Sequence, residues 1–313
     1  MYRNPEEPPP WIRREENGCP VSLPQQAWIE ASLQWFVREF GMAKVSHGPV
    51  LPTRDLPPHG YSGTNEDIAA LVCGMAEAMQ LGVDLTLVFF DRTAESEEAK
   101  RKAPRTVGHY YVEDGQTIIG LDVTDAADPE YVTAIIAHEM SHVRLLGEDR
   151  ISPDRKDGER LTDLLTVFFG FGVFTTNAVM RFGEVAKRGF TVHPLGYLDD
   201  RMLNAARNDG YSRLGYLTQR EFGYAMACYA WLRHETRPAW AVHLDPGPRA
   251  YLRQGLAYLA TDGAPGEFPT RRPGADPSAV RVTPKLGKPW LDVPYPRHML
   301  GDRPPDAPGD RPR

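Results

Sequence analysis

The sequence predicts an α+β fold that is mostly helical, with a small β-sheet just ahead of a central helix. Apolar residues recur at helical spacing through most of residues 25–262. Strand-like runs are confined to residues 85–123, where a hairpin signal also lies. A chain of 313 residues can bury a large core, and no internal repeat divides it. We therefore expect one principal folded domain.

Two helices are expected before the sheet. From Gln25 to Phe40 the apolar side chains stand at helical spacing. Residues 50–62 are rich in proline and glycine, which is typical of a loop. Thr64 or Asn65 then caps a helix that runs to about Met79.

The predicted sheet and the central helix follow in sequence. LTLVFF, at residues 85–90, is strand-like, and HYYVEDGQTIIGLDV, at 109–123, places two β-rich runs on either side of an Asp-Gly dipeptide. That dipeptide is favoured in tight hairpin turns. Asp128 and Pro129 then begin the helix PEYVTAIIAHEMSHVRLL, with the proline in its first turn.

Further helices are expected after the central one, from about 157 to 169 and near 201–206, 218–233 and 248–259. The most apolar stretch of the chain runs from Leu164 to Met180. It is shorter than the roughly 20 residues that span a membrane, and Gly170 and Gly172 interrupt it. A buried core helix that breaks near these glycines is expected instead.

The two ends of the chain differ from its middle. Residues 1–24 are charged and proline-rich, and we expect a flexible arm. Residues 263–313 contain 12 of the 29 prolines and show little apolar periodicity, which indicates an extended tail. We therefore expect residues 25–262 to form the folded domain.

Composition excludes several classes of protein. The net charge of −6 argues against nucleic acid as the main partner, because phosphate binding needs a basic face. Cys19, Cys73 and Cys228 are odd in number and far apart, so neither a disulfide framework nor a thiolate metal site is indicated. The first residues lack the apolar run of a signal peptide. We expect a cytoplasmic protein without stable membrane insertion.

The central helix carries the motif His138-Glu139-Met140-Ser141-His142. Positions i and i+4 share one face of a helix, so both imidazoles can reach a single ion, unless they are simply two core histidines with satisfied nitrogens. Glu139 is rotated from His138 by about 100°, close enough to contact a metal-bound water without binding the metal. With three protein ligands, Zn²⁺ keeps a fourth position for water and lowers its pKa. We therefore expect a zinc site with Glu139 as the general base.

A second pattern lies on the next predicted helix, where Glu159 and Asp163 stand at i and i+4. H-E-x-x-H on one helix followed by E-x-x-x-D on the next resembles the gluzincins, the thermolysin-like clan of zinc peptidases. The resemblance covers roughly residues 107–177. It implies a zincin-like domain, Glu159 as the third zinc ligand, and Asp163 as the hydrogen-bond partner of the far nitrogen of a ligand histidine.

The sequence leaves alternatives for these carboxylates. Glu148 stands six residues after His142, where the metzincin pattern places its last ligand, although Leu145 occupies the position at which that pattern needs glycine. Glu159 and Asp163 could instead form a solvated helix start, since acidic residues favour the first turn.

Two further features of the region are open. Arg144 is polar where the gluzincins usually keep an apolar side chain. Peptide hydrolysis also needs a donor for the developing oxyanion, commonly a histidine or tyrosine in this clan. The downstream candidates are His193, Tyr197, Tyr211, Tyr216, Tyr224 and His234.

The expected function is a zinc-dependent hydrolase, most specifically a metallopeptidase that acts on a peptide or protein. The alternative is a zincin-like domain that serves as a non-catalytic metal-binding or regulatory interaction module. Metal content together with peptide cleavage separates the two classes.

Truncation after Gly263 is expected to leave the midpoint of thermal unfolding within a few degrees of the full-length value. The removed segment has too little apolar periodicity to contribute much to a core. Calorimetry of the two proteins measures the difference. An insoluble truncated protein would show that Trp290 and its neighbours belong to the core.

Overall fold

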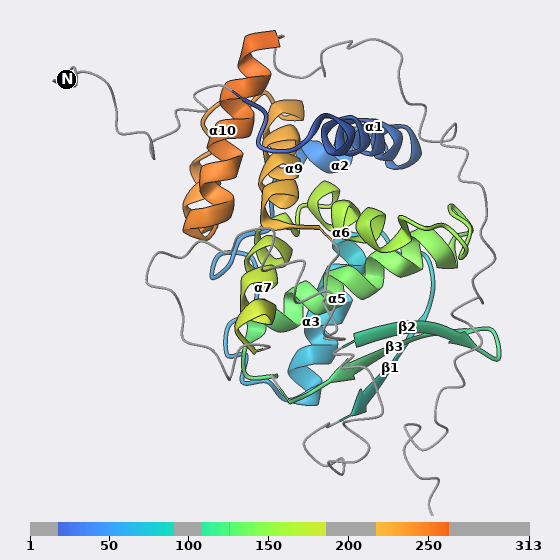
Figure 1. Ribbon diagram of the computed structural model, residues 1–313. Coiled ribbons are helices and arrows are strands. Elements are labelled where there is room, and N and C mark those ends of the chain that lie inside the picture. Colours follow the sequence, from blue (N-terminus) through green and yellow to red (C-terminus); the bar gives the residue numbers. More distant parts are fainter. Residues whose placement is uncertain (1–17, 91–107, 125, 186–216, 263–313) are drawn as a thin grey trace, which may run out of the picture.

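The computed structural model describes residues 18–90, 108–124, 126–185 and 217–262. The arm up to residue 17, the helix expected near 201–206 and the tail from 263 lie outside these ranges. The described part is mostly helical with one small sheet, as the α+β prediction requires (Figure 1). None of its helices is both long and apolar enough to cross a membrane.

Three strands form a mixed sheet in the order β1-β3-β2. Strand β1 (Leu85–Phe90) runs parallel to β3 (Gln116–Asp122), and β2 (Gly108–Glu113) pairs with β3 in the antiparallel direction. The β2–β3 turn is the predicted Asp-Gly pair, with φ of 51° at Asp114 and 77° at Gly115. Positive φ at both central residues is the requirement of a type I′ hairpin turn.

The helices follow the predicted order. They are α1 (Leu23–Phe40), α2 (Ala43–Ser46), α3 (Asn65–Ala78), α5 (Pro129–His142), α6 (Gly158–Phe168), α7 (Gly172–Val185), α9 (Gln219–Leu232) and α10 (Pro246–Asp262). A π-helical turn (Val143–Gly147) extends α5, and a 3₁₀ turn (Ala239–His243) precedes α10.

Local side-chain contacts explain where several helices begin. The Thr64 hydroxyl accepts the amide of Asp67 at the start of α3, and the Asp128 carboxylate accepts the amide of Tyr131 at the start of α5. Helix α1 begins two residues before the predicted start. The reason is that Gln25 reaches back to accept the backbone N–H of Ser22, which closes a capping box.

Helix α5 lies at the centre of the molecule (Figure 1) and contacts the sheet and helices α3, α6 and α7. Every residue from Tyr131 to Ser141 is buried, not just the apolar stripe. His138 and Glu139, the motif's first two residues, are therefore buried in the protein interior.

The most apolar segment breaks at its glycines, as predicted. Helix α6 ends at Phe168, Gly170 has a φ of 91°, and α7 begins at Gly172. A Cβ atom at Gly172 would lie 2.4 Å from the sulfur of Met226. The second glycine thus allows α7 to approach α9 closely.

Helices α9 and α10 lie side by side (Figure 1) and also depend on glycine for their contact. A Cβ atom at Gly223 would lie 2.4 Å from Cβ of Tyr251, and one at Gly255 would lie 2.7 Å from Cβ of Ala227. Separations this short cannot be relieved by a side-chain rotation, because the opposing atoms are themselves Cβ atoms. The two helices would have to move apart.

Gly223→Ala is expected to lower the free energy of unfolding by about 2 kcal/mol through overpacking at this contact. The matched control is Gly74→Ala in α3, where an added Cβ meets no atom within 4 Å. There the better helix propensity of alanine should raise the free energy of unfolding by about 0.5–1 kcal/mol. Urea titration measures both. Equal effects of the two substitutions would contradict the proposed role of Gly223.

Candidate metal centre

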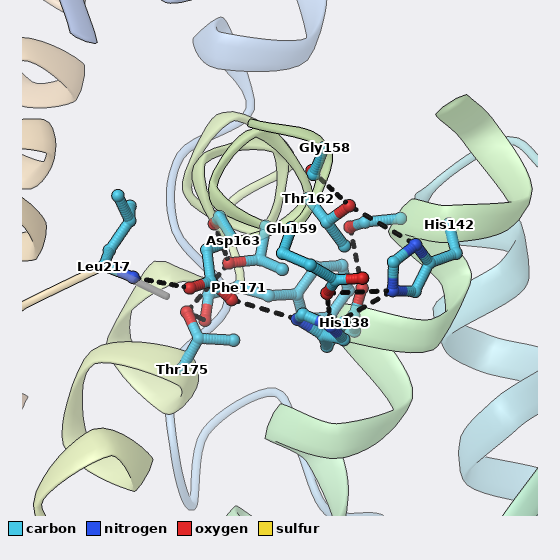
Figure 2. Close-up of polar contacts among 12 residues, drawn as sticks. His138, His142, Gly158, Glu159, Thr162, Asp163, Phe171, Thr175 and Leu217 are labelled. Atoms are coloured by element: carbon cyan, nitrogen blue, oxygen red, sulfur yellow. Dashed lines mark hydrogen bonds and ion pairs between the residues drawn. The ribbon is translucent and has the colours of Figure 1, made fainter. Parts of the chain in front are cut away.

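His138, His142 and Glu159 meet where the end of α5 lies against the first turn of α6 (Figure 2). Nε2 of His138 is 3.2 Å from Nε2 of His142 and 3.3 Å from Oε2 of Glu159. Nε2 of His142 is 3.5 Å from the same Oε2. The three side chains each offer one ligand atom to a common point, and together they could hold a metal ion.

Asp163 orients His138 from one turn further along α6. Its Oδ1 lies 2.9 Å from Nδ1 of His138, and both side chains are buried. A carboxylate can only accept, so Nδ1 carries a proton and donates it to this bond. Oδ2 of Asp163 accepts the backbone N–H of Leu217 at 3.0 Å, which anchors the chain two residues before α9 to the same carboxylate.

Thr162 and Tyr110 flank His142, and the sequence reasoning did not single out either. The Thr162 hydroxyl donates to the carbonyl of Gly158, so its oxygen is oriented to accept a proton from Nδ1 of His142, 3.4 Å away (Figure 2). The Tyr110 ring lies nearly parallel to the imidazole, at 13° and 6.3 Å between centroids. Thr162 stands three residues after Glu159, a helical spacing that could have indicated it.

The charges of the cluster stabilise one another. Burial alone would lower the pKa of His138, but the hydrogen bonds to Asp163 and Glu159 outweigh it and raise that pKa well above its usual value. Burial would raise the pKa of Glu159, but its contacts with the two imidazoles hold that pKa far below the usual range. A protonated His138 and an ionised Glu159 thus stabilise one another.

Glu139 lies beside the cluster and not in it. Its side chain is buried, with 4% of the residue exposed, and its Cγ and Oε1 lie close to the backbone of Gly108 at the start of β2. No residue in the described ranges is seen to donate a hydrogen bond to its carboxylate. Its negative charge contributes to raising the pKa of His138.

Glu148, the alternative third ligand, is turned to other partners. Its carboxylate accepts hydrogen bonds from Arg144 and, at 2.8 Å, from Arg150. Arg144 is buried, donates to the carbonyl of Gln80 at 3.1 Å and stacks over the ring of Phe40. The polar side chain of Arg144 therefore has its own partners within the fold. Glu148 is not one of the three clustered donors.

Two of the six candidates for an oxyanion donor lie within the described residues. Tyr224 is fully buried and donates its hydroxyl proton to Glu30 between α9 and α1, so this tyrosine is not available to a substrate. His234 follows the end of α9 with a φ of 61°. The others, His193, Tyr197, Tyr211 and Tyr216, lie outside the described residues.

Glu159→Ala is expected to lower metal affinity far more than the 10–100-fold typical of a residue that only orients a ligand, because it removes a donor atom. Asp163→Asn should stay within that smaller range. An amide oxygen can still accept from His138, but the amide nitrogen would then face the N–H of Leu217. Competition with a chromogenic chelator measures both affinities. A larger loss for Asp163→Asn would contradict these roles.

Glu148→Ala is the matched control for Glu159→Ala. It should leave metal affinity nearly unchanged but lower the free energy of unfolding by about 2–3 kcal/mol, since the buried Arg144 loses its carboxylate partner. Metal titration and urea unfolding separate the two effects. If this variant loses the metal while Glu159→Ala keeps it, Glu148 is the third ligand.

Comparison with known proteins adds no relative to this picture. No protein-family model, no curated protein and no solved structure matches the chain.

Proposed function

We propose that the protein is a zinc-dependent hydrolase, most specifically a metallopeptidase of the gluzincin kind. One observation carries the proposal. Two ligand atoms on a tetrahedral zinc ion, each 2.0–2.1 Å from it, are about 3.3 Å apart. The three separations in the cluster are 3.2, 3.3 and 3.5 Å. The donor atoms are thus spaced as three corners of a zinc tetrahedron.

The chemistry of the donors also favours zinc. Two imidazoles and one carboxylate suit Zn²⁺, whereas Ca²⁺ and Mg²⁺ prefer oxygen ligands alone. Asp163 and Thr162 contact the far nitrogens of the two imidazoles, as partners of metal-bound histidines do. Three protein ligands leave one tetrahedral corner open, which is the arrangement of catalytic and not of structural zinc sites.

In this proposal each neighbouring residue has a distinct task. A zinc ion bound there would lower the pKa of a water in the open position and polarise a substrate carbonyl. Glu139 would take the proton of that water and pass it to the leaving amine. Glu139 is buried on α5 between the two histidines, beside the proposed zinc ligands, which supports this role. Asp163 would keep His138 in the tautomer that presents Nε2.

The exposure of the cluster to solvent supports its role as a substrate-binding site. The Glu159 side chain is 42% exposed although both histidines are largely buried, so the cluster opens to solvent on the α6 side. We further propose that the protein acts in the cytoplasm on a peptide or protein, without nucleic acid and without stable membrane insertion. The net charge of −6 supports the exclusion of nucleic acid.

A non-catalytic interaction module is the second candidate, and one observation favours it. The charges of His138 and Glu159 stabilise one another, since the pKa of His138 is raised and that of Glu159 is lowered, and Asp163 contacts the same imidazole. Such a network can stabilise a fold without catalysing a reaction.

The test combines metal analysis with a peptide-library cleavage assay. We expect about one zinc per chain, lost in His138→Ala and His142→Ala. Glu139→Gln should keep the zinc and lower turnover by about 10²–10⁴-fold, because only the proton acceptor is removed. Glu130→Gln is the matched control, since it removes a carboxylate from the first turn of the same helix, about 13 Å away along its axis.

Three other results would change this proposal. A protein that binds no zinc at neutral pH, even when zinc is added, would contradict the metal site. Stoichiometric zinc without cleavage of any peptide would favour the interaction module. Equal losses in Glu139→Gln and Glu130→Gln would remove Glu139 from the role of proton acceptor.

A further inference from the structure

Gly108, the first residue of β2, lies directly against the side chain of Glu139. A Cβ atom at Gly108 would be 2.9 Å from Oε1 and 3.1 Å from Cγ of Glu139, and 2.6 Å from Cγ2 of Ile135. Ile135 and Glu139 are four residues apart on α5, so they form one wall of this contact. The space that a side chain at 108 would need is filled by the proposed proton acceptor and its neighbour.

The backbone conformation does not explain the glycine. Gly108 is not among the residues with positive φ, and it pairs with Leu121 in the regular register of β2 and β3. Glycine weakens a strand, because it has no side chain to pack and loses more entropy on folding. What requires glycine here is the close approach of the helix.

The next residue on the same face of β2 is large. Side chains two apart in a strand point to the same side, and Tyr110 stacks on His142. Strand β2 therefore follows the face of α5 that carries the motif, with no side chain beside Glu139 and a tyrosine beside His142. This difference in size sets how near each motif residue comes to the strand.

We propose that Gly108 is a positioning residue for Glu139. The missing side chain leaves the space in which the carboxylate lies, beside the two histidines. A larger residue at 108 displaces that carboxylate, because the three atoms nearest the added Cβ belong to Ile135 and Glu139 and none of them to His138, His142 or Glu159. The consequence for turnover rests on the proposed function, whereas the contact itself does not.

A double-mutant cycle in thermal unfolding tests the contact without any assay of activity. Gly108→Ala should lower the melting temperature by on the order of 5 °C, as overpacking in a domain of this size does. In the Glu139→Ala background the same change should lower the melting temperature clearly less, because the displaced carboxylate is absent. An equal loss in both backgrounds would overturn the inference.

Gly120→Ala is the matched control, since Gly120 also lies in the sheet and pairs with His109. A Cβ atom there would be 3.4 Å from the nearest atom, in the His109 ring, and its three nearest atoms include none of Glu139. Its effect on the melting temperature should be the same with and without Glu139→Ala. Should Gly108→Ala fail to fold, the cycle is run in an Ile135→Ala background, which removes the 2.6 Å contact and keeps the contact with Glu139.

Zinc content and kinetics distinguish positioning from a general loss of structure. Gly108→Ala should retain the zinc content of the wild type. On the best peptide from the library its kcat should fall on the order of 100-fold with little change in KM, as a misplaced catalytic group predicts. Unchanged kcat alongside a positive cycle would overturn the positioning role. If the wild type cleaves no peptide, the proposed function fails, and the cycle still decides whether Gly108 holds Glu139 in place.

Discussion

His138 is an imidazole in the protein interior, and both of its nitrogens need a polar partner there, because an unpaired buried polar group is costly. Asp163 meets one nitrogen, while His142 and Glu159 meet the other. All of the nearest partners outside α5 come from α6, so the packing of these two helices and the polar network require each other. The second oxygen of Asp163 extends the same requirement to the amide of Leu217.

The same polar network can both stabilise the fold and position the donor atoms of a metal site. Opposite charges in contact lower the cost of burying each group, which is why the pKa of His138 is raised and that of Glu159 is lowered. The same contacts aim three donor atoms at one point, with the spacing that a tetrahedral ion requires. Glu139 is not one of these three donors, and it lies next to a strand that has no side chain at Gly108.

Local rules predicted the elements well because their signals lie within a few residues of one another. The Thr64 cap and the Asp114-Gly115 turn act through contacts within the same short segment, and the structure confirms both. Helix α1 begins two residues before the predicted start, because a capping box forms at Ser22. The zincin-like relation stays a prediction, as do the ends of the chain.

The sequence by itself determined that His138 and His142 share one helical face, because spacing within a helix is fixed by its geometry. It favoured Glu159 over Glu148 only through the gluzincin resemblance and Leu145, because both are carboxylates at a reasonable distance along the chain. Only the tertiary structure shows that Glu148 pairs with Arg144 and that Glu159 faces the histidines. The close approach of Gly108 to Glu139 could not be predicted from the sequence either. Contacts between residues distant in sequence depend on how helices and strands pack, and no local pattern records that packing.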